Sequence, residues 1–352
     1  MMRPKIFAPL AMAATLAMPL LMSFSPSWAG QGEPSALQTL DKNPKKSSLT
    51  LTLDNDLLAS GSDQYYTNGI QLTYYNVDRH APPVIERFLD DVVGYDVGVA
   101  TSTSFFLGQK IFTPKDITIA EEQPGDRPWA GWLYAGFLMS NIYPDHSDRL
   151  GVVVGVVGPA SLAEPTQKFI HDKISDSPRP AGWDNQLRSE PGLIVTWDRR
   201  WQNFAGYTTG NYRTQFEPNV SVALGNINTY AGAGMNVTFG PAQNEFRDVP
   251  PRIYPAGLGS GYFDHPNSRD WDWYTFAGVN GRAVARDIFL DGNTFRGGPS
   301  VDKKDFVYDA NAGVAFTYKD TRLSYGLTYR SKEFHGQEDE TVFGSVGVSY
   351  RF

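Results

Sequence analysis

Apolar and polar side chains alternate with a period of two along the C-terminal third of the chain. Between residues 306 and 318 the apolar positions are Phe306, Tyr308, Ala310, Ala312, Val314, Phe316 and Tyr318. Segments 321–330 and 342–352 repeat the pattern, with glycine, serine, threonine and arginine at the intervening positions. Because successive side chains of a strand point to opposite faces, the alternation predicts β-strands that each have one apolar face.

Two β architectures produce this alternation. Segments of about ten residues with aromatic side chains near their ends are typical of strands that cross an outer membrane. Soluble β-sandwiches also alternate, so periodicity alone leaves both architectures open. The C-terminus favours the barrel, because Ser345, Gly347 and Tyr350 precede a terminal aromatic residue, Phe352. This arrangement resembles the terminal strand signal of Gram-negative outer-membrane barrels.

Counting such segments along the chain predicts about twelve strands, an even number, as expected when both termini of a barrel lie in the periplasm. The predicted strands lie near 48–55, 67–76, 102–110, 129–143, 148–157, 190–202, 214–224, 230–239, 271–287, 306–317, 321–331 and 342–352. The predicted fold class is therefore all-β, a transmembrane antiparallel β-barrel with a short helix in an external loop.

The N-terminus has the features of a secretion signal. A basic start precedes an apolar stretch and a small-residue cleavage site that ends at Ala29. We expect residues 1–29 to be a signal peptide, residues 30–46 a flexible periplasmic lead-in, and residues 47–352 the barrel. An uncleaved membrane anchor is the alternative interpretation of the first segment.

With the N-terminus in the periplasm, alternate connections face the outside of the cell. The longest of these external loops is 158–189, and long loops on a rigid scaffold commonly carry function. Residues 83–93 read as a short amphipathic helix in a periplasmic connection.

The composition and the absent motifs exclude several classes of partner and catalytic site. The formal net charge is −7 without runs of lysine or arginine, so nucleic acid is not an expected partner. The chain has no cysteine, which excludes disulfides, thiolate catalysis and cysteine-based metal sites. It also lacks a Gly-x-Ser-x-Gly, His-Glu-x-x-His or phosphate-loop motif.

Two groups of residues remain as candidates for chemistry. Asn55 and Asp56 lie at the outer end of the first predicted strand, and Thr67 lies at the start of the second. Their carboxylate, amide and hydroxyl oxygens are ligands that Ca²⁺ accepts, although the same residue types also form ordinary hairpin turns. His171 lies in the longest external loop, within a stretch that can form one or two helical turns. A histidine there can act as a general base, and an exposed loop histidine is the alternative.

Several segments, taken in order and spacing, resemble the lipid A 3′-O-deacylase family of outer-membrane barrels, the LpxR type. They are Leu53-Asp54-Asn55-Asp56, the segment 65–69, the segment 125–134, Gly158-Pro159-Ala160-Ser161 with the downstream His171, and the segment 182–187 with Glu190-Pro191. The resemblance spans almost the whole mature chain.

The resemblance implies a twelve-stranded barrel that hydrolyses the ester of the 3′-linked acyloxyacyl group of lipid A with Ca²⁺. The site of this family lies outside the barrel, between the wall and a helix from an external loop. If the roles of the family's site residues are transferred to the matching positions of this chain, His171 is the general base that activates water. Asn55, Asp56 and Thr67 are the polar set that holds Ca²⁺ and the reacting ester. The implied partners are lipopolysaccharide and other outer-membrane lipids, and we expect a monomer integral to the Gram-negative outer membrane.

The sequence leaves two questions about the site and one about the function. Asn55 shares the parity of the lipid-facing Leu53, whereas Asp56 has the opposite parity, so the strand must bend or end there. Arg127 or Lys168 is a candidate for contacting the sugar phosphates, and an ordinary solvated surface charge is the alternative for each. A deacylase of another outer-leaflet lipid, such as phospholipid, and a non-enzymatic channel or structural barrel are the alternative functions.

Overall fold

The computed structural model describes residues 47–59, 65–76, 100–143, 145–173, 177–202, 204–242, 263 and 270–352. The predicted signal peptide, the predicted lead-in and the helix expected at 83–93 lie outside the described residues. Within the described ranges, none of the helices has both the length and the apolar character needed to cross a membrane.

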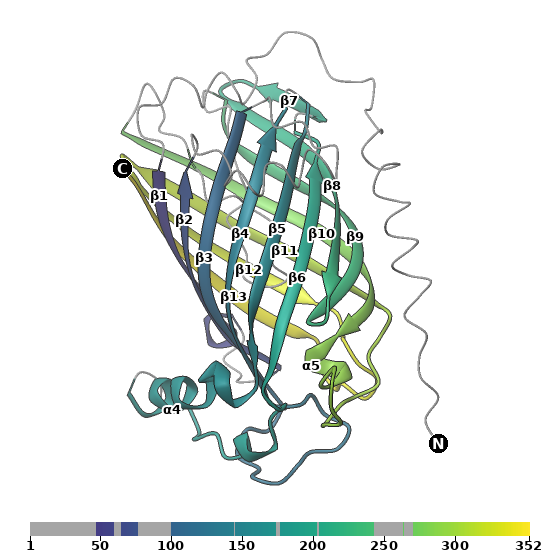
Figure 1. Ribbon diagram of the computed structural model, residues 1–352. Helices are drawn as coiled ribbons and strands as arrows, with labels where there is room; N and C mark the ends of the chain where they lie inside the picture. Colours follow the sequence, from purple (N-terminus) through teal and green to yellow (C-terminus); the bar gives the residue numbers. More distant parts are fainter. Residues whose placement is uncertain are drawn as a thin grey trace. The chain divides into compact units, whose positions relative to one another are not determined.

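In the described part of the chain, thirteen strands form a single antiparallel sheet (Figure 1). The strands are β1 (Ser47–Asn55), β2 (Tyr65–Asn76), β3 (Ala100–Thr113), β4 (Ala130–Ile142), β5 (Ser147–Val157), β6 (Glu190–Arg200), β7 (Ala205–Thr209), β8 (Tyr212–Gly225), β9 (Asn228–Pro241), β10 (Trp271–Asp287), β11 (Phe306–Tyr318), β12 (Thr321–Arg330) and β13 (Thr341–Arg351).

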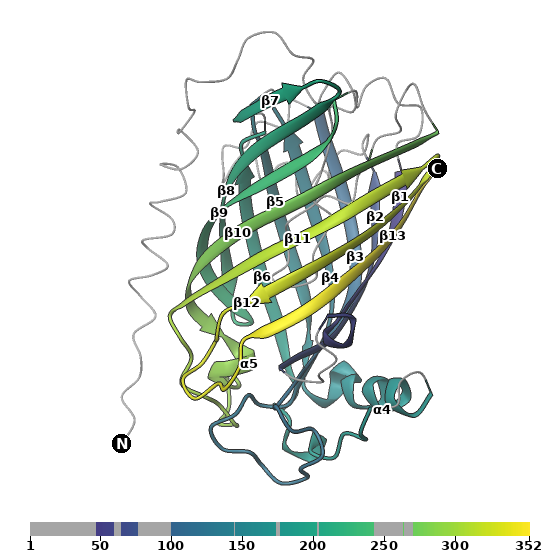
Figure 2. The same ribbon diagram turned by 180° about the vertical axis from the view of Figure 1, so that it is seen from behind.

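Twelve of these strands close into a barrel, which confirms the predicted architecture (Figures 1 and 2). Strand β1 pairs with β2 on one side and with β13 on the other, and β6 pairs with β8. The short β7 pairs with residues 212–216 of β8, whereas β6 pairs with residues 219–225, so β7 continues the line of β6 along β8. The strand absent from the prediction is therefore a rim extension of the barrel.

The alternation seen in the sequence separates the two faces of the wall. In β1 the leucines Leu49, Leu51 and Leu53 are exposed on the outside, whereas Thr50 and Thr52 are buried on the inside. This apolar outer face suits the hydrocarbon of a bilayer, and the inner face is polar.

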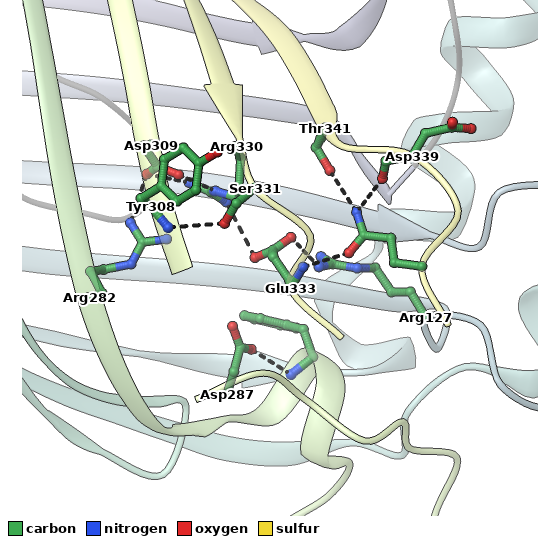
Figure 3. A network of polar contacts seen from close by, with 12 residues as sticks. Arg127, Arg282, Asp287, Tyr308, Asp309, Arg330, Ser331, Glu333, Asp339 and Thr341 are labelled. Atoms are coloured by element: carbon green, nitrogen blue, oxygen red, sulfur yellow. Dashed lines mark hydrogen bonds and ion pairs between the residues drawn. The ribbon is translucent and has the colours of Figure 1, made fainter. Parts of the chain in front are cut away.

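Ion pairs fill the interior near both ends of the barrel. Toward the periplasmic end, Asp148 and Asp198 of β5 and β6 pair with Arg199 and Arg149 on the opposite strand. Toward the external end, both Arg282 and Arg330 pair with Asp309, at 2.7 and 2.8 Å, and Glu333 pairs with Arg127 (Figure 3). All of these side chains are buried, and each charge has an opposite partner, as burial requires.

We expect the Arg127–Glu333 pair to stabilise the external mouth, because it joins the β3–β4 loop to the β12–β13 loop. Glu333→Ala leaves a buried guanidinium without this carboxylate, and we expect a loss of about 3–5 kcal/mol in the free energy of unfolding. Urea unfolding in lipid vesicles measures the loss. The exposed pair of Lys115 and Glu338 supplies the control, since Glu338→Ala should change stability by less than about 1 kcal/mol. Equal effects of the two substitutions would contradict the assignment.

The external end carries the short helices. They are η1 (Asp56–Leu58), η3 (Pro159–Ser161), α4 (Ala163–Lys173), η4 (Trp183–Asn185) and α5 (Ile288–Asp291). Both views place α4 and α5 at the end of the barrel opposite to the C-terminus (Figures 1 and 2). The predicted helix in the longest external loop is therefore present as α4.

Candidate active site on the outer wall

The first strand ends at the candidate site. Strand β1 stops at Asn55, and η1 begins at Asp56, which answers the parity question left by the sequence. The Leu57 amide donates to Asn55 Oδ1 at 2.7 Å and to Asp56 Oδ1 at 2.9 Å, so both side chains cap the new helical turn. Because the strand gives way to a turn here, Asn55 and Asp56 are not held to opposite faces of the wall.

A β-bulge brings Thr67 to the outer face. Between Tyr66 and Asn68 the pairing of β2 with β3 shifts by one residue, which leaves Thr67 as the extra residue. The Thr67 hydroxyl lies 2.8 Å from the hydroxyl of Thr113, which shares the outward parity of Leu107. Asn55 lies opposite Asn68 in the β1–β2 register. The bulge therefore places Thr67 on the same side of the wall as Asn55.

Helix α4 packs on this outer wall over β3 and β4. Its buried residues are Ala163, Gln167 and His171, which recur every fourth residue and form one face. Close approach depends on Gly131 of β4, because a Cβ atom there would lie 2.1 Å from the Ala163 Cβ. The helix thus aims His171 toward the wall, and His171 is only 7% exposed.

One hydrogen bond fixes the tautomer of His171. Its Nδ1 lies 2.7 Å from the carbonyl oxygen of Pro178. A carbonyl oxygen can only accept, so Nδ1 carries the proton, and the neutral ring has its lone pair on Nε2. This arrangement orients the imidazole in the way that a general base requires.

The strand order relates these parts to one another. The sequence of neighbours is β13, β1, β2, β3 and β4. Helix η1 packs on β13 and β2, and α4 packs on β3 and β4. Along the strand order, the outward face of β1 and β2 therefore lies between the strands that η1 and α4 cover. Asn55, Asp56, Thr67 and His171 thus belong to adjoining strands and their coverings at one end of the barrel.

Sequence reasoning missed Gln167, which lies one helical turn before His171 on the same buried face. Its Oε1 accepts a hydrogen bond from Trp183 Nε1 at 2.9 Å. Its Nε2 is buried without a hydrogen-bond partner within the described part of the chain. The spacing of four residues from His171 was the available signal, and it becomes informative only once the helix is known.

The two cations expected at the sugar phosphates have other partners. Arg127 is buried and paired with Glu333 inside the external mouth, so the expectation that it contacts substrate is wrong. Lys168 is paired with Glu164 on α4 at 2.5 Å, and it is partly exposed.

A cleft of about 560 Å³, lined mainly by polar residues, lies beside Pro178. Its lining includes Pro178, which accepts the hydrogen bond from His171, together with Lys115 and Asp116 of the β3–β4 loop. Hydrogen bonds to Asp339 and Glu338 raise the pKa of Lys115, and the bond from Lys115 lowers the pKa of Asp339. The Thr118 hydroxyl likewise lowers the pKa of Asp116. Lys115, Asp339 and Asp116 are therefore charged at neutral pH.

A cation at this site would depend on oxygen ligands of mixed kind. Within the described ranges, no three residues of the types His, Cys, Asp and Glu are grouped so that they could hold a metal ion. Asp56 supplies a carboxylate, Asn55 an amide oxygen and Thr67 a hydroxyl, and Ca²⁺ accepts such neutral oxygens together with backbone carbonyls and water. The donor chemistry fits a hard cation better than a soft one.

Comparisons with known proteins bear on the family of this chain and on its fold. A sequence model of the family described as "Outer membrane protein LpxR" matches residues 16–352. The chain belongs to the LpxR family of outer-membrane proteins. The suspected family and the outer-membrane location predicted from the sequence are thereby confirmed. No curated protein matches the chain at a significant level of sequence similarity.

A solved structure supports the fold of this LpxR-family chain. The chain resembles "LpxR from Salmonella typhimurium" with a TM-score of 0.69 and 22% identity, over 87% of this chain and 100% of that chain. At 22% identity this similarity concerns the fold alone. The β-domain of the Bordetella autotransporter BrkA is more distant, with a TM-score of 0.42 and 10% identity over 88% of this chain and 99% of that chain.

Proposed function

We propose that this LpxR-family barrel hydrolyses the 3′-O-linked acyloxyacyl ester of lipid A in the outer leaflet, with Ca²⁺ bound and His171 as general base. Membership of the family supports the assignment as an outer-membrane lipid A deacylase. The observation that carries the proposal is the buried His171, fixed through Nδ1 to Pro178 and turned toward the outer wall of the barrel.

In the proposed reaction, His171 Nε2 takes a proton from water, and the water oxygen attacks the carbonyl carbon of the ester. The ester C–O bond then breaks, and the imidazolium returns its proton to the departing sugar oxygen. The products are the sugar alcohol and the acyloxyacyl acid. Base assistance of this kind contributes about 10²–10⁴-fold to the rate. Asn55, Asp56 and Thr67 would hold Ca²⁺, and the ion would supply positive charge to stabilise the carbonyl oxygen of the ester.

The surroundings suit a lipid substrate. Leu57 and Leu58 of η1 and Phe169 of α4 expose apolar surface beside the polar groups, with Phe169 60% exposed. Apolar side chains at this position can contact acyl chains in the leaflet, while the polar cleft beside Pro178 can accommodate a sugar head group. The ester lies at the boundary between these two parts of such a lipid.

Mass spectrometry of lipid A incubated with the purified, folded barrel tests the proposal. We expect loss of one acyloxyacyl group in the presence of Ca²⁺ and an unchanged spectrum with chelator. A parallel incubation with phospholipid vesicles tests the alternative substrate class. Release of fatty acid from phospholipid alone would replace lipid A by phospholipid in the assignment.

The channel alternative predicts ion conduction, and we expect none. The interior has buried ion pairs near both ends, including Asp148–Arg199 and Asp309–Arg330, so its charges there are of both signs and neutralise each other. Planar bilayers with the inserted protein measure conductance, and an open porin provides the positive control. Stable, porin-sized current steps from the purified chain would favour the channel over the enzyme.

A further inference from the structure

Strand β1, which ends at Asn55 just before Asp56, is joined inside the barrel by a side-chain hydrogen bond to β2, which carries Thr67. The Tyr66 hydroxyl donates to Asp54 Oδ2 at 3.1 Å, and both side chains are fully buried. Asp54 directly precedes Asn55, and Tyr66 directly precedes Thr67. The bond therefore joins the inner sides of the two segments whose outer sides form the candidate site. Asp54 and Tyr66 are called the lumenal pair below.

Aromatic packing fixes the Tyr66 ring. It lies 5.0 Å from the ring of Phe343 in an edge-to-face arrangement and 5.5 Å from the ring of Phe112. These neighbours belong to β13 and β3, on either side of the β1–β2 hairpin. Because the packing does not depend on the hydroxyl, phenylalanine at this position preserves the ring and removes only the hydrogen bond.

A basic side chain lies near Asp54. It is Lys110 of β3, whose ammonium nitrogen is 5.1 Å from the ring centroids of both Trp132 and Tyr134. Asp54, Tyr66 and Lys110 are all buried, so water does not compete for the hydrogen bond of the lumenal pair.

The backbone next to Thr67 needs such a contact. Thr67 is the extra residue of the bulge, so the β2–β3 ladder does not fix its position as it fixes the position of its neighbours. Tyr65 has a φ of 65°, in the left-handed region that side chains other than glycine rarely adopt. Strained positions of this kind persist only where surrounding contacts determine them.

We propose that Asp54 and Tyr66 are positioning residues, and that their hydrogen bond holds the Thr67 bulge in place relative to Asn55 and Asp56. The inference rests on the proposed function, because it assigns the lumenal pair to the same reaction site. It adds two residues that contact neither the substrate nor the cation and that act from the opposite side of the barrel wall.

Tyr66→Phe is the first test. We expect kcat for lipid A deacylation to fall about ten- to a hundredfold, because small displacements of reacting groups reduce rates to this extent. KM for the lipid should change less than about twofold, since the apolar contacts with the acyl chains are unaffected. Tyr75→Phe is the matched control. It removes a buried hydroxyl from the same strand at its periplasmic end, and it should leave both constants unchanged.

Substitutions of Asp54 separate positioning from a merely structural role. Asp54→Asn keeps an oxygen that can accept from Tyr66 and should retain most of the activity, whereas Asp54→Ala should match Tyr66→Phe. If the two residues act as one contact, the double variant Tyr66→Phe with Asp54→Ala is no slower than either single variant. Independent, multiplicative losses would overturn the proposal, as would a Tyr66→Phe variant with the kcat of the parent protein.

Amide hydrogen exchange tests the positioning role of the lumenal pair without any measurement of deacylase activity. If the parent protein deacylates nothing, the proposed function fails, and exchange in segments 54–59 and 65–69 still tests the lumenal pair. At least about tenfold faster exchange there in Tyr66→Phe but not in Tyr75→Phe supports the positioning role. Unchanged exchange in both variants overturns it.

Discussion

His171→Ala is expected to lower the rate of lipid A deacylation by roughly 10²- to 10⁴-fold, because it removes the group that takes the proton from water. His171 is buried on the wall-facing side of α4, and its Nδ1–H bond to Pro178 leaves Nε2 as the basic nitrogen. Initial rates of acyl release, followed by mass spectrometry at saturating Ca²⁺, measure the loss. The unheated barrel band on a denaturing gel verifies that the variant is folded.

Two further substitutions sharpen this test. In His171→Asn the amide Nδ2 can donate to Pro178 as the imidazole does, but the side chain takes up no proton at neutral pH, so it should be as inactive as alanine. Lys168→Ala removes a partly exposed side chain from the same helix and should change the rate less than twofold. Near-parental activity of His171→Asn would assign the histidine to anchoring the loop.

Removal of Ca²⁺ is expected to lower the rate by roughly 10²- to 10³-fold, the effect of losing a stabilising charge at a developing oxyanion. Asp56 is the carboxylate of the proposed donor set and is almost fully buried where β1 gives way to η1. Asp56→Asn should therefore raise the Ca²⁺ concentration for half-maximal activity at least about tenfold. A calcium titration of the deacylation rate, buffered with chelator, gives both values.

Asp116→Asn is the control for this substitution, because it removes an exposed carboxylate from the neighbouring cleft and should leave the calcium titration unchanged. Full activity of the parent protein in chelator would exclude Ca²⁺ from the mechanism while leaving the role of His171 intact. An equal shift in both variants would indicate general attraction of cations to the acidic loops.

The sequence by itself determined the barrel. Lipid on one side of the wall and polar groups on the other impose a period of two on every strand. The side of the wall on which Leu51 or Thr52 lies can therefore be predicted without knowing which strands pair. All twelve barrel strands were predicted within a few residues of their observed bounds. A short helix in the longest external loop was expected because the stretch around His171 can form one or two helical turns, and α4 is that helix.

Only the tertiary structure decided how the site is assembled. The bulge at Thr67 is a one-residue shift between two strands, and a single chain segment does not encode it. Gln167 becomes a candidate site residue only when α4 is seen packed against Gly131. Arg127 ceases to be a candidate for substrate contact only when Glu333 is found beside it. These relations join residues far apart in sequence, and local periodicity carries no information about such contacts.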